Sequence, residues 1–313
     1  MFAITILLVF LTGYATQRGS VCAVTATWEL VVERKASRYV GFGFCAACGL
    51  LVMAIGNTLG RPVFDLYTGL HVSNAALVGG AIVGMGAFIN GRCAFGTVAE
   101  LGSGIVSRLG TLGGFIAGTS LGDLAHMTLA GMTPVSSPLT MLSASTTLAI
   151  AMLAVTLFGV ALTRLTRPRG APDWTPLRAM AVIGLSNGIL LVLARGWPYT
   201  SLLMQIARGA HDAVGPHALL AMAFVLGSVA GGVALGQFHP SLGSTRDWMR
   251  SLGGGAIMGI GAVLVPGGND AMLLVGVPLM LPNLLAAYAA MSLMLVVIVA
   301  LRVRREHPKL TDA

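Results

Sequence analysis

The chain has 313 residues, of which 56% are hydrophobic and only 10% are charged, and its mean hydropathy is +0.85. A soluble domain is usually about 25% charged, so this composition excludes a soluble globular protein. The formal net charge of +8 would indicate nucleic-acid binding in a soluble chain, but in a membrane protein it is typical of positive cytoplasmic loops. The apolar runs of about twenty residues are too long for the alternating strands of a membrane β-barrel, so we expect an all-α polytopic membrane protein.

Nine apolar segments follow one another along the chain, and each approaches the length of about twenty residues that crosses a membrane. The first segment, Met1–Thr16, has no preceding Lys or Arg, so we expect a retained helix rather than a secretory signal. The segments predict about nine transmembrane helices, near residues 1–16, 39–57, 73–91, 105–125, 141–163, 177–194, 217–235, 252–266 and 281–301.

Four connections between these segments differ from ordinary loops, at about 18–34, 92–104, 195–210 and 267–280. Each begins with glycine beside a polar or cysteine residue and continues into an apolar stretch that is too short to span. Such irregular backbone is tolerated at membrane depth only where it is buried in protein or lines a cavity. We therefore expect four re-entrant loops, each followed by a half-helix.

The chain also contains an internal repeat. Residues 79–87 read GGAIVGMGA and residues 254–262 read GGAIMGIGA, at an offset of 175, and a weaker echo relates 18–19 to 195–196. The first four spans then correspond to the last four, each five spans later. Because five is an odd number, we expect the second repeat to be inverted in the membrane, as in many transporters. The expected organisation is a single transmembrane domain over residues 1–313, with a first repeat (about 1–130), a connector helix (about 141–163), a second repeat (about 177–302) and a cytoplasmic tail (303–313).

The basic residues predict the orientation of the chain. If the N-terminus lies outside, fourteen of the 19 Lys and Arg fall in inner segments and only Arg61 and Arg208 fall in outer segments. The positive-inside rule therefore favours a multi-pass protein with its N-terminus outside and its C-terminus in the cytoplasm. The remaining three, Arg18, Arg92 and Arg195, fall at the broken points.

The first two broken points have the composition of an anion site. Gly19 and Gly91 let the backbone turn sharply, and the half-helix that follows each turn presents free N–H groups and a partial positive charge. Arg18 and Arg92 would add full charges, and arginine inside a membrane is usually functional. The alternative is a structural role, in which these arginines pair with Glu29, Glu33 or Glu100.

Cys22 and Cys93 each follow one of these glycine turns. A thiol is a small, polarisable group with a weak S–H donor, which suits a large sulfur atom better than a hydroxyl would. The alternative is that each thiol is only a small buried apolar side chain. Cys45 and Cys48 form a C-x-x-C pattern inside an apolar span, where we expect packing rather than a redox pair.

Signals for other kinds of site are missing from the sequence. The six histidines show no metal-ligand spacing, and no G-x-x-x-x-G-K-[ST] loop is present. We therefore expect no metal, no cofactor and no enzymatic activity. A membrane thiol redox enzyme or sensor remains the alternative of another class, although such an enzyme needs a base near its nucleophile and no His adjoins a Cys in the sequence.

The segments around these cysteines resemble a known family. Residues 17–22 (QRGSVC) and 84–96 (GMGAFINGRCAFG) are similar to the first two cysteine motifs of the YeeE/YedE sulfur-transport family of bacterial inner-membrane proteins, and residues 259–268 (GIGAVLVPGG) are similar to the third. The resemblance covers nearly the whole chain. It implies a permease that takes up a small sulfur-containing anion, with thiosulfate as the first expectation, past Cys22 and Cys93, which would relay the ion through S–H···S contacts. It also leads us to consider a small cytoplasmic sulfur-carrier protein as a partner.

The third motif departs from the family pattern. It ends in Gly-Gly-Cys in the family, whereas this chain has Gly-Gly-Asn-Asp over residues 267–270. Either Gly268 or Asn269 takes the place of the cysteine. An Asn amide can donate hydrogen bonds to an oxyanion but cannot imitate a thiol, and the carboxylate of Asp270 opposes an anion unless it is paired or protonated.

The remaining outer break offers Arg195 and the hydroxyl of Tyr199 as further pathway groups. The first two cysteine motifs keep the family residues, whereas the third motif has changed. The sequence therefore does not decide the identity of the substrate. The alternative to a thiosulfate permease is a transporter of a different sulfur or selenium species, or of a cation drawn by Asp270.

Overall fold

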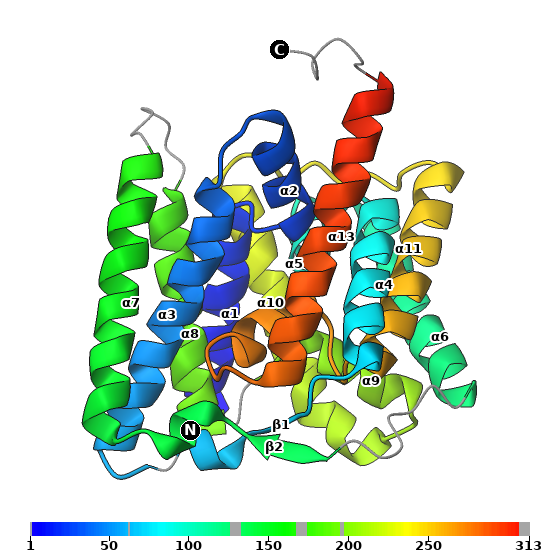
Figure 1. Cartoon of the computed structure of the whole chain (residues 1–313). Helices are drawn as coiled ribbons and strands as arrows, with labels where there is room; N and C mark the ends of the chain where they lie inside the picture. The colour runs from blue at the N-terminus through cyan, green and yellow to red at the C-terminus, as the bar shows by residue number, and fades with distance from the viewer. Residues whose placement is uncertain (1, 62, 126–132, 167–173, 195–196, 307–313) are drawn as a thin grey trace.

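The computed structural model describes residues 2–61, 63–125, 133–166, 174–194 and 197–306, without the side chains of 211–214. The described chain is a bundle of long helices that stand side by side (Figure 1). The long helices in this part of the chain are α1 (Phe2–Arg18), α3 (Ser37–Thr58), α4 (Asn74–Asn90), α6 (Leu109–Leu124), α7 (Ala144–Leu165), α8 (Pro176–Ala194), α10 (His211–Ala234), α11 (Thr245–Leu264) and α13 (Pro282–Glu306).

The long helices lie over the predicted apolar segments, with differences at their ends. The largest is in α11, which begins at Thr245 because Ser244 and Asp247 form a capping box ahead of the apolar run. Within the described residues, seven helical segments are long and apolar enough to cross a membrane, and the bent pair at the end of α11 would be an eighth. A polytopic membrane protein is therefore confirmed. The number nine stays a prediction, since α6 has only 16 residues.

Short helices occur at the four broken points. They are α2 (Ala23–Val32), α5 (Ala94–Gly102), α9 (Tyr199–Ala207) and α12 (Asn269–Ala271), and α12 continues into the π-helical segment η4 (Met272–Gly276). The segments Phe2–Val32 and Asn74–Gly102 each qualify as one candidate span, whereas Asn269–Gly276 bends by 53° from α11. Short helices thus stand where half-helices are predicted, and the re-entrance of their loops stays a prediction.

The two glycine repeats pack against each other where α4 crosses α11. A Cβ at Gly86 would lie 2.8 Å from the carbonyl oxygen of Gly254, and one at Gly261 would lie 2.6 Å from that of Gly79. Helix backbones approach this closely only where small residues face each other. The repeated sequence therefore makes a central helix contact, and its preference for glycine follows from packing.

Smaller elements cover one end of the bundle. An antiparallel ribbon of β1 (Thr68–Leu70) and β2 (Pro134–Ser136) lies at the end where the N-terminus is drawn (Figure 1). The backbone N–H of Leu70 donates a 2.9 Å hydrogen bond to the side-chain oxygen of Asn283, which attaches the ribbon to α13. The hydropathy pattern did not predict this ribbon. Three 3₁₀ turns complete the described elements, η1 (Phe64–Leu66), η2 (Val106–Arg108) and η3 (Pro138–Met141).

Candidate functional site

The short helices begin close together in the interior, and their first residues contact one another. Cys22 is the N-cap residue of α2, Cys93 that of α5 and Gly268 that of α12. The first N–H groups of a helix have no partner within the helix, so they need acceptors from elsewhere. In this protein, groups at the start of one short helix serve as the acceptors for the start of another.

Cys22 and Cys93 lie together at the start of α2. The sulfur of Cys93 accepts a 3.2 Å hydrogen bond from the backbone N–H of Ala23, the first residue of α2, and the two thiols interact with each other. Both residues are buried, with exposed fractions of 3% and 1%. The thiol of the second broken point therefore caps the helix of the first, and the two cysteines form one site.

The backbone of α5 leaves room for the Cys22 side chain only because residue 96 is glycine. A Cβ at Gly96 would lie 2.6 Å from the Cys22 sulfur and 3.2 Å from Cδ of Arg92. No real Cβ makes contacts of 2.6 Å, so any larger residue would move the thiol or the arginine. Gly96 is a site residue that we did not single out from the sequence, although it belongs to the second cysteine motif.

A cavity of about 330 Å³ opens over the cysteine pair, and we call it the vestibule. Its lining comes from the end of α1, from α2 and the loop before it, from the start of α3 and from α5. Only Cys22 of the two cysteines reaches its wall. The polar and charged side chains that line the vestibule include Gln17, Thr25, Arg38, Arg92, Glu100 and Ser103.

Glu100 holds two arginines beside the vestibule. Its Oε1 accepts a 2.5 Å hydrogen bond from Nε of Arg92, and its Oε2 pairs with Arg108. Arg92 also donates a 2.9 Å hydrogen bond from Nη1 to the hydroxyl of Thr25. Two guanidinium groups share one carboxylate, so this cluster keeps a net positive charge. The Arg92–Glu100 pairing weighed from the sequence is present, and it does not cancel the charge that an anion would meet.

Arg38 contributes to the vestibule, whereas Arg18 lies against a ring. Arg38 pairs with Glu29 at 3.1 Å and donates to the carbonyl oxygen of Ser20 at 2.6 Å. Arg18 is the last residue of α1, and its guanidinium carbon lies 5.9 Å from the ring centroid of Tyr14. The cysteine motifs do not indicate Arg38, because it lies outside them in the sequence and only the fold brings it over the first loop.

The N-cap position of α12 corresponds to the two cysteines. Cys22, Cys93 and Gly268 each stand immediately before a short helix, so Gly268 takes the same N-cap position as the two cysteines. The side chain of Thr200 fills the space there, because a Cβ at Gly268 would lie 2.6 Å from its Oγ1 and 2.8 Å from its Cβ. The backbone N–H of Gly268 also donates to that hydroxyl at 3.3 Å.

Asn269 and Tyr199 close around the start of α5. The side-chain oxygen of Asn269 accepts a 3.0 Å hydrogen bond from the backbone N–H of Ala94. The Tyr199 hydroxyl donates a 2.9 Å hydrogen bond to the carbonyl oxygen of the same residue. Residues of the second half therefore satisfy the backbone beside Cys93, and the oxygen rather than the N–H₂ group of Asn269 makes this contact.

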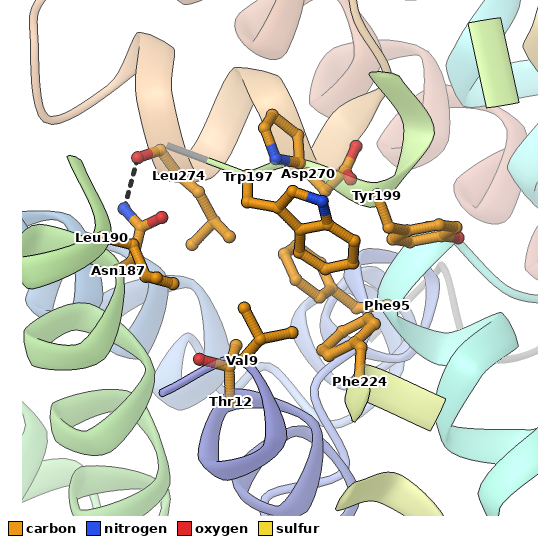
Figure 2. Close-up of a pocket in the computed structure, with 11 residues that line it drawn as sticks. Val9, Thr12, Phe95, Asn187, Leu190, Trp197, Tyr199, Phe224, Asp270 and Leu274 are labelled. Carbon is orange, nitrogen blue, oxygen red and sulfur yellow. Dashed lines mark hydrogen bonds between the residues drawn. The ribbon is translucent and has the colours of Figure 1, made fainter. Parts of the chain in front are cut away.

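A second, much smaller cavity, of about 20 Å³, lies beyond these contacts, and we call it the aromatic cavity. Trp197 and Tyr199 of the 197–199 segment meet Phe95 and Phe224 there, with Asp270 on its wall (Figure 2). The ring centroids of Trp197 and Phe224 are 6.1 Å apart. Bulky rings therefore narrow the space on the side of the site that faces away from the vestibule.

The other predicted positions fall near the site or outside the described residues. Gly19 follows α1, and its carbonyl oxygen accepts from Arg38 at 3.3 Å. Gly91 ends α4 with φ of 80°, a left-handed conformation that favours glycine. Arg195 lies outside the described residues. Cys45 and Cys48 are buried in α3 against α8, which agrees with a packing role.

Comparison with known proteins gives one match that covers most of the chain. No curated protein matches. A family model described as sulphur transport matches residues 18–299, a range that includes all four broken points and both glycine repeats. The resemblance stated from the cysteine motifs is thereby confirmed, and the chain belongs to the YeeE/YedE sulfur-transport family of membrane proteins.

Proposed function

We propose that this sulfur transporter moves a small sulfur-containing anion, with thiosulfate as the first candidate, through the site formed by Cys22 and Cys93. The observation that carries the proposal is the position of the cysteine pair. Two thiols lie at the starts of two short helices, beneath a vestibule that contains the Arg92–Glu100–Arg108 cluster. This arrangement combines soft sulfur contacts with positive charge.

The vestibule supplies the electrostatic part of recognition. The guanidinium of Arg92 is partly exposed, at 37%, although Glu100 and Thr25 already hold it. It is therefore oriented and still able to donate to an oxyanion, which is the property of arginine that suits anion recognition. The start of α2 adds the partial positive charge of a helix N-terminus beside the Cys22 thiol.

The thiols supply the part that is selective for sulfur. Sulfur is large and polarisable, and an S–H group donates weakly to it, so a sulfur-bearing end of an anion suits a thiol better than an all-oxygen anion does. The anion would pass from the vestibule to Cys22, then to Cys93, and then along Tyr199 into the aromatic cavity, or in the reverse direction.

The inverted repeat is part of the proposal. Helix contacts recur with the halves exchanged, since α1 packs on α10 as α8 packs on α3, and α6 packs on α11 as α13 packs on α4. We propose that these are equivalent pairs related by a pseudo-two-fold axis, with the substrate site where the repeats meet. We also propose that the vestibule faces the cytoplasm of a bacterium, where a sulfur-carrier protein would receive the sulfur.

The test is uptake of labelled thiosulfate into proteoliposomes that contain the purified protein. We expect the variants Cys22→Ser and Cys93→Ser to lose at least about tenfold in uptake, which corresponds to one net hydrogen-bond-sized contact. The matched control is the double variant Cys45→Ala/Cys48→Ala, which removes two other buried thiols. Full uptake by both serine variants would disprove the thiol relay.

A different substrate is the second candidate, and Thr200 is the observation that favours it. We take Gly268 as the position of the third family cysteine; Thr200 fills its side-chain space, so the outer half would present a hydroxyl and the Asp270 carboxyl instead of a thiol. A thermal-shift screen of thiosulfate, sulfite, sulfate and selenium analogues separates the candidates. Stabilisation by another oxyanion without stabilisation by thiosulfate would replace the first candidate with that ion.

A further inference from the structure

Asp270 is a buried acid on the route along which the proposed function would carry an anion. Its exposed fraction is 1%, and it lines the aromatic cavity together with Trp197 and Tyr199 (Figure 2). An ionised carboxylate in this position repels any anion that enters the cavity, because charges interact strongly where water is excluded. The fold therefore places a like charge in the path of the substrate.

The carboxyl group is held by uncharged partners. Its Oδ2 accepts a 3.0 Å hydrogen bond from the backbone N–H of Thr200, and its Oδ1 pairs with the hydroxyl of the same residue. Within the described residues, no ion pair involves Asp270. The hydrogen bonds from Thr200 favour the ionised carboxylate, and burial favours the protonated carboxyl. No charged partner in this part of the chain fixes either protonation state.

The described groups around Asp270 are almost all unable to titrate. From α9 it faces Tyr199 and Thr200, and from α5 it faces Phe95. From α8 the cavity contains Asn187, whose side-chain N–H donates to the carbonyl oxygen of Leu274 at 2.6 Å, and α1 contributes only Val9 and Thr12. Tyr199 is the one titratable neighbour in the cavity wall among the described residues. A proton taken up in this cavity therefore has Asp270 as its acceptor.

We propose that Asp270 is a proton-binding site, and that the anion passes the aromatic cavity only while this carboxyl is protonated. This inference rests on the proposed function. The carboxylate takes one proton from the solution on the side of the aromatic cavity, and the neutral acid no longer repels the anion. The proton leaves to the solution on the vestibule side after the anion has passed. One proton moves with each anion, so a divalent anion crosses with a net charge of −1.

The experiment measures anion uptake and proton entry together. Proteoliposomes loaded with a pH-sensitive dye receive labelled thiosulfate under an inward proton gradient. We expect the parent protein to carry protons only when thiosulfate is present, with faster uptake at acidic external pH. We expect the Asp270→Asn variant to lose thiosulfate-dependent proton entry and to lose the dependence of uptake on external pH. The matched control Asp65→Asn changes an exposed acid in η1 and should behave as the parent.

A second variant protects the test against a misfolded Asp270→Asn protein. Thr200→Val removes the hydroxyl donor to the carboxylate and keeps the backbone donor, so the acid should bind its proton roughly tenfold more tightly and shift the pH profile of uptake about one unit toward alkaline values. Uptake without proton entry in the parent, or proton entry that survives in Asp270→Asn, overturns the inference and leaves the proposed function standing. A sodium dependence with no proton entry also overturns it.

Failure of the proposed function has a different signature. If the parent takes up no thiosulfate at all, the proposed function fails, and infrared spectroscopy of the purified protein still tests the proton site. A protonated-carboxyl band that titrates in the parent and is missing from Asp270→Asn supports the site. An identical band in both proteins overturns it.

Discussion

Thr200 stands where the side chain of residue 268 would be. A Cβ built on Gly268 lies 2.6 Å from Oγ1 and 2.8 Å from Cβ of Thr200, and the Gly268 N–H donates to that hydroxyl. Gly268 and the threonine of α9 therefore compete for one volume. A change at either position has consequences for the other.

The first prediction concerns this pair. Gly268→Cys alone should destabilise the protein by about 1–3 kcal/mol, because the new side chain overpacks against Thr200. The double variant Gly268→Cys/Thr200→Ala should recover most of that loss, since it vacates the volume that the thiol needs. Thermal unfolding in detergent measures both. Equal stability of the single and double cysteine variants would show that the two side chains do not compete.

The second prediction concerns Gly96. Gly96→Ala should displace the Cys22 thiol, whose sulfur would lie 2.6 Å from the added Cβ, and should lower thiosulfate uptake as strongly as Cys22→Ser does. The control is Gly113→Ala in α6, where an added Cβ meets nothing within 4 Å. That control should keep full uptake, and its stability should rise by up to about 1 kcal/mol through lower chain entropy. Unchanged uptake in Gly96→Ala would remove Cys22 from the pathway.

The third prediction concerns the carboxylate that two arginines share. Glu100→Gln should destabilise the protein by about 2–4 kcal/mol, because it leaves the guanidinium groups of Arg92 and Arg108 adjacent with no anion between them. Glu33→Gln is the control, since its pair with Lys35 is exposed and should contribute less than about 1 kcal/mol. Denaturant-dependent unfolding distinguishes the two. A Glu100→Gln protein as stable as the control would mean that solvent already screens the cluster.

The fourth prediction concerns orientation. The vestibule is lined by the end of α1 and the start of α3, which lie at the end of the bundle where α13 ends (Figure 1). The excess of basic residues predicts that this end lies in the cytoplasm. A fluorescent-protein fusion to the C-terminus should fluoresce, and an alkaline phosphatase fusion at the same place should be inactive. Active phosphatase at the C-terminus would reverse the proposed direction of the pathway.

Local patterns in the sequence already carried much of the fold. The length of an apolar segment and a break marked by glycine depend only on neighbouring residues. The positions of the long helices and of the short helices could therefore be predicted from the sequence. The observed helix ends differ from the predicted ones where a polar first turn is helical, as in α11 after the capping box of Ser244 and Asp247. The cysteine motifs were specific enough to indicate the family, and the match over residues 18–299 confirmed it.

The sequence by itself determined the kind of protein and half of the site, and the tertiary structure decided how that half is completed. The motifs of Cys22 and Cys93 are visible in the sequence, but the hydrogen bond that brings them together, from the Ala23 N–H to the Cys93 sulfur, joins residues 70 positions apart. The contact of Asp270 with Thr200 likewise spans 70 residues, and that of Asn269 with Ala94 spans 175. Such pairs form because packed helices bring separate short-helix starts to one point, and no local pattern records which side chain will fill the space between them.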